Sequence, residues 1–333
     1  MKILVIRFSS FGDLVLATGF LKRLKQCFIK DEVHLLTKDI YTDIFENHRY
    51  IDKIIPLPFH TSFFEFSNLI AQLKNEKYDL LIDIHNNIRS KWIRFKLRTD
   101  KQFVIKKESL KKLTLIFLKK QVSVTPLINL YFEVLSKITG NKEPIEEPFI
   151  SIKDGSKERV IKLLKHTPSK KGIIIHPKSK WRAKEWSYVK YMQLINLIEI
   201  TYPDRVIYLT CSQVDEPIIK AIHKNCKNTI PLCGILSINE LSYLIKETGL
   251  LISGDTGIIH LARAFNKPQI IILGATVKNF GYIPIYKGVQ VIEKDLHCRP
   301  CSRNGSAPCL FGTYECLESI SVDEVFNAVL QGL

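Results

Sequence analysis

Residues 2–24 read KILVIRFSSFGDLVLATGFLKRL and set a pattern that the rest of the chain repeats. The apolar run from Lys2 to Ile6 has the length of a short buried strand. The polar loop Ser9-Ser10-Phe11-Gly12-Asp13 separates it from Leu14 to Leu24, whose apolar residues recur with helical spacing. The stretch therefore predicts a strand, a loop and a helix, in that order.

The same unit recurs in both halves of the chain. Further strands are predicted at 33–37, 78–84, 171–176, 205–210, 249–253 and 269–273, with helices near 41, from 88, and at 188–200, 216–223, 256–265 and 322–330. Strands that alternate with helices favour parallel sheets covered on both faces. The predicted fold class is α/β, with two doubly wound halves.

A linker separates these halves. Residues 143–148 read EPIEEP, with two prolines and no helical period, so we place a domain boundary at about 150. Ligands of open parallel sheets bind beyond the carboxyl ends of the strands. Two halves that face each other would therefore form a ligand-binding cleft.

Length and charge restrict the partners. The chain has 333 residues, about twice the roughly 150 of one domain. Hydrophobic residues make up 46%, which excludes a disordered chain. Lys and Arg number 49 against 33 Asp and Glu, so the net charge is 49 − 33 = +16. This surplus predicts an anionic partner: a nucleic acid, an anionic membrane surface, or a phosphorylated or carboxylated small molecule.

The hydropathy pattern predicts a cytoplasmic protein. No uncharged run approaches the roughly 20 residues that cross a bilayer. The apolar stretch near the start is interrupted by Arg7 and Asp13, so it is too short for the apolar region of a signal peptide.

The segment Asp255-Thr256-Gly257 follows one predicted strand and opens a helix. Backbone N–H groups at a helix start, a hydroxyl, and a glycine that permits close approach can together bind a diphosphate. His260 lies one turn further along the same helical face. The alternative is that Asp255 or Thr256 only caps the helix and that His260 is a packed or surface residue.

Asp13 lies in the loop after the first strand, on the ligand side of the sheet. This loop lacks the three glycines of a dinucleotide fingerprint, which argues against a Rossmann dehydrogenase. A carboxylate in this position can accept a proton from an attacking hydroxyl. The alternative is again a helix cap.

The connection after the strand that ends at His176 is strongly basic. It contains Lys178, Lys180, Arg182 and Lys184. In a cleft these cations can neutralise phosphates, whereas the alternative is a solvated basic loop. Trp181 and Trp186 favour the cleft, because exposed loops seldom contain tryptophan.

Together these motifs have a family likeness. The opening Ile3 to Asp13, the KEW at 184–186, the GDTGIIHLA at 254–262, the KP at 267–268, the LGAT at 273–276 and the CRPC at 298–301 occur in one order along the whole chain. In these residues the chain resembles the heptosyltransferases of glycosyltransferase family 9.

The resemblance implies a GT-B architecture, in which two Rossmann-like domains face a cleft. It implies that residues 1–150 bind the acceptor, that 151–318 bind a nucleotide sugar, and that 319–333 form a helix that packs back on the N-terminal domain. The implied donor is ADP-L-glycero-D-manno-heptose and the implied acceptor is the inner core of lipopolysaccharide. The implied transfer inverts the anomeric centre and requires no metal or other cofactor.

The resemblance also assigns roles to residues. Asp13 matches the family's general base, and Lys184 matches the lysine that holds the donor phosphates. Other donor-site matches are Lys178, Ser179, Asp255, Thr256, Gly257 and His260. The segment around Asp215 and Glu216 is expected near the ribose, and Ser10 and Gly12 are expected on the acceptor side. Lys178 stands where a neutral residue is commoner and 274–276 lack a proline, so the nucleotide and the sugar stay open.

A basic band extends from Arg89 to Lys120. It contains Arg89, Lys91, Arg94, Lys96, Arg98, Lys101, Lys106, Lys107, Lys111, Lys112, Lys119 and Lys120 against only Asp100 and Glu108. Leucines and aromatics interrupt it, as in segments that lie on an anionic membrane. We assign Arg89, Lys91, Arg94, Lys111 and Lys112 to an anionic glycolipid acceptor or to the cytoplasmic face of the inner membrane. The alternative is a helix packed on the sheet with a solvated lysine edge.

The eight cysteines form two groups. Cys27, Cys211, Cys226 and Cys233 are scattered and are expected to be small buried residues in a reducing cytosol. Cys298, Cys301, Cys309 and Cys316 are clustered, with a leading C-x2-C that could hold a structural zinc. Free thiols or a local disulfide are the alternatives.

Two other kinds of protein stay open. One is a GT-B enzyme that uses another nucleotide sugar, or a sugar-nucleotide epimerase of the same architecture. The other is a non-catalytic protein whose basic face binds lipid or nucleic acid. Because the basic band lacks the interleaved aromatic platform of single-strand binders, we expect no nucleic-acid partner.

Overall fold

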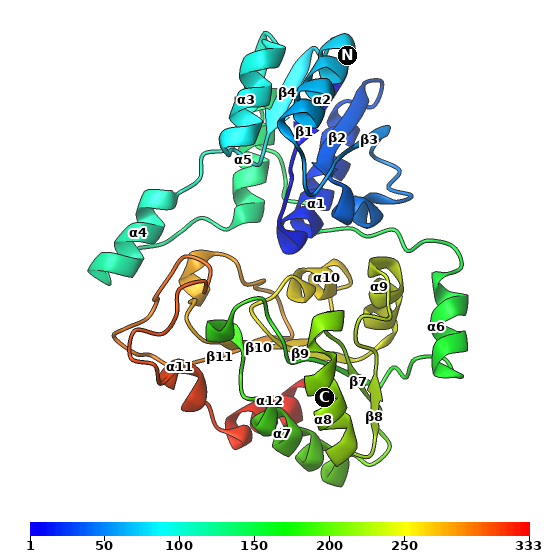
Figure 1. Cartoon of the computed structure of the whole chain (residues 1–333), viewed down its shortest axis with the longest axis vertical. Helices are drawn as coiled ribbons and strands as arrows, with labels where there is room; N and C mark the ends of the chain where they lie inside the picture. Colours follow the sequence, from blue (N-terminus) through cyan, green and yellow to red (C-terminus); the bar gives the residue numbers. More distant parts are fainter. Residues whose placement is uncertain (121) are drawn as a thin grey trace. The chain divides into compact units, whose positions relative to one another are not determined.

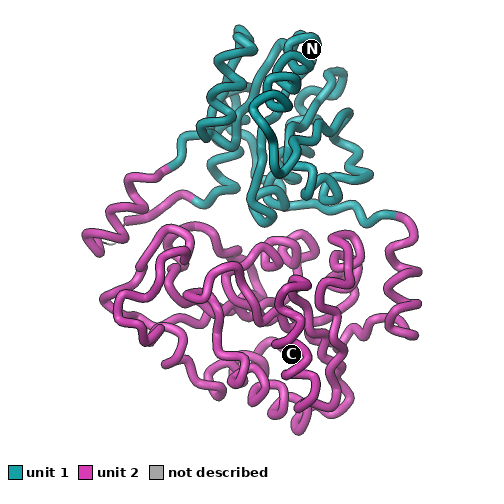
Figure 2. Tube along the Cα trace, viewed as in Figure 1, with its two compact units in different colours: residues 1–107, 126–153 teal, residues 108–125, 154–333 magenta. Residues whose placement is uncertain are grey.

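The computed structural model describes residues 1–120 and 122–333, which form two compact units. Unit 1 comprises residues 1–107 and 126–153, and unit 2 comprises residues 108–125 and 154–333 (Figure 2). Each unit contains a parallel sheet with helices packed on it (Figure 1). The prediction of an α/β chain with two doubly wound halves is confirmed.

Unit 1 has a sheet with strand order β3-β2-β1-β4-β5. Its elements are β1 (Lys2–Ile6), α1 (Phe11–Cys27), β2 (Glu32–Lys38), η1 (Asp39–Phe45), β3 (Lys53–Leu57), α2 (Phe63–Asn75), β4 (Leu80–Asp83), α3 (Ile88–Leu97), β5 (Lys101–Val104) and α5 (Leu127–Thr139). The central strand β1 pairs in parallel with β2 and β4, so that Ile6 lies opposite both Leu36 and Asp83. The loops that follow β1 and β4 therefore leave the sheet at the same edge.

Alternation along β1 builds the core of unit 1. Leu4 and Ile6 pack in one buried cluster with Leu69 and Ile70 of α2 and Ile93 of α3. Because successive side chains of a strand point to opposite faces, the intervening residues of β1 face the other side. Helices α1 and α5 pack against each other in the same unit (Figure 1). Both faces of the sheet are thus apolar, as a parallel sheet requires.

Unit 2 has a sheet with strand order β11-β10-β9-β6-β7-β8. Its strands are β6 (Ile173–His176), β7 (Ile207–Leu209), β8 (Thr229–Pro231), β9 (Leu250–Gly254), β10 (Gln269–Leu273) and β11 (Val289–Glu293). Its helices are α4 (Ser109–Leu118), α6 (Ser156–Leu164), η2 (Arg182–Lys184), α7 (Tyr188–Thr201), η3 (Gln213–Asp215), α8 (Glu216–Asn225), α9 (Ile238–Glu247), α10 (Ile258–Ala264), η4 (Lys278–Phe280), α11 (Glu315–Glu318) and α12 (Val322–Gly332).

The C-terminal helix α12 belongs to unit 2. Val325, Ala328 and Val329 join the buried cluster of this unit, and the helix contacts α7, β10 and β11. The apolar stripe of α12 is therefore covered by the sheet of unit 2 and by α7. That residues 319–333 also pack back on the N-terminal domain stays a prediction.

The basic band is divided between the units, which also differs from its placement in the acceptor domain. Leu115 and Ile116 of α4 pack with Val124 and Phe280 in a cluster of unit 2. Lys119 donates to the backbone carbonyls of Cys298 and Pro300, at 2.9 and 2.8 Å. Residues 108–125 therefore belong with unit 2 although they interrupt the sequence of unit 1.

No helix in the described part of the chain has both the length and the apolar character that crossing a bilayer demands.

Candidate functional site

In unit 1, Asp13 lies in the first turn of α1, directly after the loop that leaves β1. Ser10 precedes the helix as its N-cap residue, and its backbone N–H and hydroxyl donate to Asp13 Oδ2 at 3.2 and 3.0 Å. Asp13 therefore does cap the start of α1, which was the alternative considered for it. Its side chain is still about a quarter exposed (26%), so capping does not exclude a second role in chemistry.

Arg7 holds the same carboxylate from inside the protein. Its side chain is only 5% exposed, and Nη2 forms a short ion pair with Asp13 Oδ2. Nη1 donates to the carbonyl of Ile84 at 2.6 Å, and the guanidinium lies 5.7 Å from the ring centre of Tyr131. Burial lowers the pKa of Arg7, but Tyr131 and Asp13 outweigh it and the pKa is raised. A permanent buried cation thus fixes the position of Asp13.

His85 is a second buried group at this edge. It follows β4, and its ring lies edge-on to Phe8 at 4.9 Å between ring centres. Burial, with Arg7 and Lys107, lowers the pKa of His85 to about 3, so the imidazole is neutral at physiological pH. Its Nδ1 is buried without a hydrogen-bond partner. A buried nitrogen without a partner is costly unless a ligand satisfies it.

Asp83 organises the connection from β4 to α3. It is fully buried, and Oδ1 accepts from the backbone N–H groups of His85 and Asn86 at 2.9 and 2.7 Å. Its Oδ2 lies 3.0 Å from Nε of Arg94. Arg94, predicted as an acceptor or membrane contact, is therefore anchored to the sheet.

The other residues predicted for the acceptor or membrane are spread over the chain. Ser10, Arg89 and Lys91 are exposed, and Gly12 is buried in α1. Lys111 and Lys112 lie on α4 with unit 2. Lys111 pairs with Glu108 at 2.5 Å, and Lys112 lies 4.0 Å from the ring centre of Tyr282. The structure thus divides this predicted set between the two units.

In unit 2, Lys184 lies at the carboxyl edge of the sheet. Its Nζ is 2.7 Å from Oδ2 of Asp255, the residue that follows β9. The hydroxyl of Thr276, which follows β10, donates to the same oxygen at 2.8 Å. Three segments far apart in the sequence therefore meet in one buried network, because parallel strands end at a common edge. The network brings together Lys184 and Asp255 of the predicted donor site and adds Thr276, which was not among the predicted site residues.

Glycines allow the segment that bears Lys184 to lie directly on the strand ends. A Cβ on Gly254 would come within 2.5 Å of the carbonyl oxygen of Lys184, and one on Gly274 within 2.3 Å of that of Ala183. Real Cβ atoms do not approach a backbone oxygen so closely, so only glycine fits at these two positions.

Arg299 supports this network from behind and was not among the predicted site residues. Its side chain is 3% exposed; Nε donates to the carbonyl of Gly274 at 2.5 Å, and Nη2 to that of Thr276 at 2.6 Å. Glu293 lies 2.9 Å from Nη2 and balances the charge. The signal was present in the CRPC motif: Arg299 binds the segment 274–276 through its side chain, and the backbone N–H of Cys301 donates to the carbonyl of Ala275 at 3.2 Å.

Further donor-site candidates surround the network. The hydroxyl of Thr256 is buried and has no hydrogen-bond partner, as expected of a group that a ligand satisfies. Gly257 is the N-cap of α10, which begins at Ile258, so the helix starts two residues later than predicted. His260 is buried within α10.

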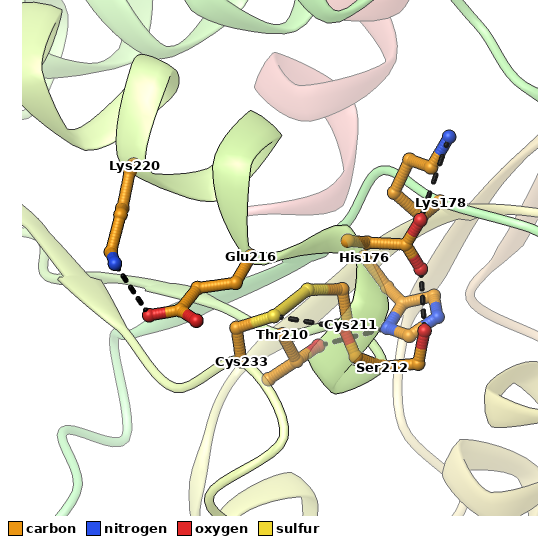
Figure 3. The surroundings of a disulfide bond; sticks show 9 residues. His176, Lys178, Thr210, Cys211, Ser212, Glu216, Lys220 and Cys233 are labelled. Carbon is orange, nitrogen blue, oxygen red and sulfur yellow. Dashed lines mark hydrogen bonds and ion pairs between the residues drawn. A yellow bond between two sulfur atoms is a disulfide. The ribbon is translucent and has the colours of Figure 1, made fainter.

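Lys178 and Ser179 are organised by an acid of their own loop. Glu185 pairs with Nζ of Lys178 at 2.8 Å and accepts from the backbone N–H of Ser179 at 3.1 Å. Asp215 lies 3.7 Å from Lys178 and accepts from the hydroxyl of Ser212 at 2.5 Å. Glu216 instead turns towards Lys220, 2.8 Å away on its own helix (Figure 3). Of the two acids predicted near the ribose, Asp215 therefore faces the basic loop and Glu216 does not.

A disulfide joins Cys211 to Cys233 beside these groups (Figure 3). It corrects the prediction that all four scattered cysteines are simple buried residues. The cause is topological: Cys211 follows β7 and Cys233 follows β8, adjacent parallel strands that end together, with a Cα–Cα distance of 4.8 Å. Cys27 and Cys226 are free thiols.

The clustered cysteines are also free thiols, which agrees with one of the alternatives considered for them. They are Cys298, Cys301, Cys309 and Cys316. Within residues 1–120 and 122–333, no group of three or more His, Cys, Asp or Glu side chains is placed to hold a metal ion. Burial raises the pKa of Cys316 to about 11, so this thiol keeps its proton. The geometry of the described residues gives no support to the structural zinc that was one of the options for this cluster.

Two doubly wound parallel units are the components of the GT-B fold. A family model described as glycosyltransferase family 9 (heptosyltransferase) matches residues 66–310. The chain belongs to this family, and it is a glycosyltransferase of the heptosyltransferase type that acts in lipopolysaccharide biosynthesis.

Individual relatives agree with this assignment. Lipopolysaccharide heptosyltransferase 1 of Campylobacter coli is 26% identical over 291 residues, covering 83% of this chain and 84% of the relative. The solved ADP-heptose lipopolysaccharide heptosyltransferase II of Escherichia coli has a TM-score of 0.77 at 16% identity, covering 99% of this chain and 98% of that one. An E. coli heptosyltransferase solved with ADP-2-deoxy-2-fluoro heptose has a TM-score of 0.71 at 15% identity, with complete coverage of both chains. At these identities, the solved structures bear on the fold alone.

Proposed function

We propose that this enzyme transfers heptose from ADP-L-glycero-D-manno-heptose to the inner core of lipopolysaccharide, or to a related glycolipid, with inversion of the anomeric centre. The observation that carries the proposal is the buried network of Lys184, Asp255 and Thr276 in unit 2. A related E. coli structure binds a fluorinated ADP-heptose, which supports the choice of donor.

In this proposal Lys184 stabilises the departing ADP. When the bond between the anomeric carbon and the diphosphate oxygen breaks, negative charge grows on that oxygen. An ammonium held in place beforehand stabilises such charge without having to reorganise. Asp255 and Thr276 fix the ammonium, and the partnerless hydroxyl of Thr256 is a donor for a phosphate oxygen.

Asp13 is the proposed base. Its carboxylate receives the proton of the acceptor hydroxyl while the oxygen of that hydroxyl forms the new bond to the anomeric carbon, on the face opposite ADP. Arg7 and Ser10 hold the carboxylate in one orientation. We propose that the transfer needs no metal and no other cofactor, because Lys184 supplies the positive charge at the diphosphate.

The acceptor and the compartment complete the proposal. A lipid-linked, anionic inner core suits the net charge of +16, and it would place the protein at the cytoplasmic face of the inner membrane as a peripheral enzyme. Unit 1 and its basic residues are the proposed acceptor-binding part, and residues 154–318 of unit 2 the donor-binding part. We propose no nucleic-acid partner.

The test is a donor screen on a defined acceptor. The purified enzyme is incubated with heptose-free inner-core glycolipid and either ADP-heptose, UDP-glucose or UDP-N-acetylglucosamine, and the products are weighed by mass spectrometry. The proposal predicts addition of one heptose from ADP-heptose only, and a β-to-α or α-to-β change at the anomeric carbon by NMR. Transfer from a UDP-sugar would contradict the proposal in favour of another GT-B glycosyltransferase. An epimerised donor without transfer would contradict it in favour of a sugar-nucleotide epimerase.

A further inference from the structure

Helix α3 of unit 1 has two apolar stripes instead of one. Ile93 and Leu97 pack inward on the cluster of α2 and the sheet. On the outer face Ile88, Trp92 and Phe95 are 86%, 44% and 59% exposed. Their spacing of four and then three residues places them on one side of the helix. A surface helix of a globular protein needs only the inner stripe, so the core does not explain the outer one.

Cations surround the outer stripe, and the helix contains no acid. Lys96 Nζ lies 4.8 Å from the ring centre of Trp92, and Arg98 lies 5.9 Å from that of Phe95. A shallow hollow of about 460 Å³ beside the stripe is lined by Lys91, Arg94, Phe95, Arg98 and Gln102. Asp83 is the acid that pairs with Arg94, and it is buried in the sheet.

The geometry points to α3 as a docking helix for an anionic lipid bilayer, with Ile88, Trp92 and Phe95 inserted among the lipids and the surrounding cations on the phosphate groups. Amphipathic tryptophan and basic side chains favour the boundary between headgroups and acyl chains. The charge of the partner follows from complementarity, because the hollow presents cations and no acid. This deepens the proposed function by assigning its membrane contact to one helix.

Helix α4 does not carry the same inference. Its buried residues Leu115 and Ile116 are used in packing on unit 2, and Lys111 is neutralised by Glu108. Leu110, Phe117 and Leu118 of α4 are also exposed, at 81%, 75% and 61%. The two helices differ in charge: Lys111 of α4 is paired with Glu108, whereas the hollow beside the exposed stripe of α3 is lined by three cations and by no acid.

The test is vesicle binding by the full chain. Wild-type protein should sediment with phosphatidylglycerol vesicles and not with phosphatidylcholine vesicles, and high salt should weaken the binding. The double variant Trp92→Ser and Phe95→Ser should bind these vesicles at least about tenfold more weakly, because two large apolar side chains are no longer transferred from water into the bilayer. The matched control is Tyr188→Ser with Ile200→Ser, which removes two exposed apolar side chains, 46% and 79% exposed, from α7.

Fluorescence identifies the inserted residue directly. Trp92 emission should shift to shorter wavelength on addition of the anionic vesicles, whereas Trp92→Phe should still bind but lose the shift. Equal binding by the α3 double variant and the wild type, no binding by the wild type, or an unchanged shift in Trp92→Phe would overturn the inference. Vesicles without acceptor keep this result separate from the transfer reaction, whose failure would leave the binding intact.

Discussion

Each unit has a charged side chain at the carboxyl edge of its own parallel sheet, and the two charges are opposite in sign. In unit 1 a partly exposed carboxylate, Asp13, is held by a buried cation, Arg7. In unit 2 an ammonium, Lys184, is held by a buried carboxylate, Asp255. The two sheets, of five and six parallel strands, therefore carry ion pairs of opposite arrangement. In the proposed function the first accepts a proton and the second holds a phosphate. The two units differ in the charge that holds this side chain: a cation, Arg7, holds Asp13, and a carboxylate, Asp255, holds Lys184.

Each site also has a buried arginine of its own. Arg7 contacts the carboxylate of Asp13 itself, whereas Arg299 contacts the backbone carbonyls of Gly274 and Thr276 and forms no hydrogen bond with Lys184. Charge-assisted hydrogen bonds of this kind contribute roughly 1.5–3 kcal/mol each. The difference between direct and indirect support should appear in the kinetics of the corresponding variants.

The largest effect is expected from Asp13→Asn. The amide keeps the size and can still cap α1, but it cannot accept the proton, so kcat should fall by about a thousandfold. Turnover of ADP-heptose on the inner-core acceptor measures this. The control is Glu65→Gln, since Glu65 forms the same capping arrangement with Ser62 at the start of α2. A variant with full activity would remove Asp13 from the mechanism.

Lys184→Met should have the next largest effect. Loss of the ammonium removes charge stabilisation of the departing diphosphate, and kcat/KM should fall by about a hundredfold. Lys180→Met is the matched control, because Lys180 lies in the same loop but is exposed and stacks on Trp181 at 5.1 Å. If both variants lose activity equally, the loop acts through its total charge and the network has no special role.

The two arginines should separate kcat from donor affinity. Arg7→Met should lower kcat about tenfold while donor affinity is kept, and Arg299→Met should weaken donor affinity by a similar factor. Arg7→Lys should restore part of the rate, because it keeps a charge beside Asp13. Steady-state kinetics with varied ADP-heptose gives both values. The comparison fails if the two variants change the same parameter.

The smallest effect is expected in stability at low pH. Burial lowers the pKa of His48 and His176 to about 4, and with Arg7 that of His85 to about 3. The unfolded chain binds these protons near pH 6.5 and the folded chain does not. The contribution of these histidines to the unfolding free energy should therefore be fully present above pH 6.5 and fall by about 3 kcal/mol per histidine as the pH approaches 4.

Unit 1 contains two of these histidines, so its unfolding should be the more sensitive to acid. Denaturant titrations between pH 7 and pH 4.5 measure the slope, that is, how steeply the unfolding free energy changes with pH. His85→Gln should flatten it, whereas the exposed His60→Gln should leave it unchanged. An equal slope in the His85 variant would mean that this imidazole takes up its proton in the folded protein as readily as in water.

The sequence predicts those parts of the fold that are buried and repetitive. The central strands β1, β9 and β10 are continuous apolar runs, and they are found where they were expected. The edge strands β5 and β11 are half exposed and carry polar residues, so their pattern does not separate them from loops. The position of α4 on unit 2 depends on contacts between residues about 165 apart, such as Leu115 with Phe280, which local periodicity does not report.

The candidate site shows the same division. Asp255 follows β9 directly, and Asp13 and Lys184 lie in the segments that follow β1 and β6. The order of the elements is therefore enough to predict that all three lie at the carboxyl edge of a sheet. Arg7 was visible only as an interruption of an apolar run, and Arg299 only as part of a cysteine motif. Their role depends on which carboxylate or carbonyl each side chain reaches, and that is fixed by tertiary packing.

The central claim is that the two units divide the work, with donor binding by unit 2 and proton removal by Asp13 of unit 1. Titration calorimetry of ADP-heptose into the wild type, Asp13→Asn and Lys184→Met tests it most directly. The same Kd is predicted for the wild type and Asp13→Asn, and a Kd about a hundredfold weaker for Lys184→Met. A donor Kd that weakens as much in Asp13→Asn as in Lys184→Met would contradict the division.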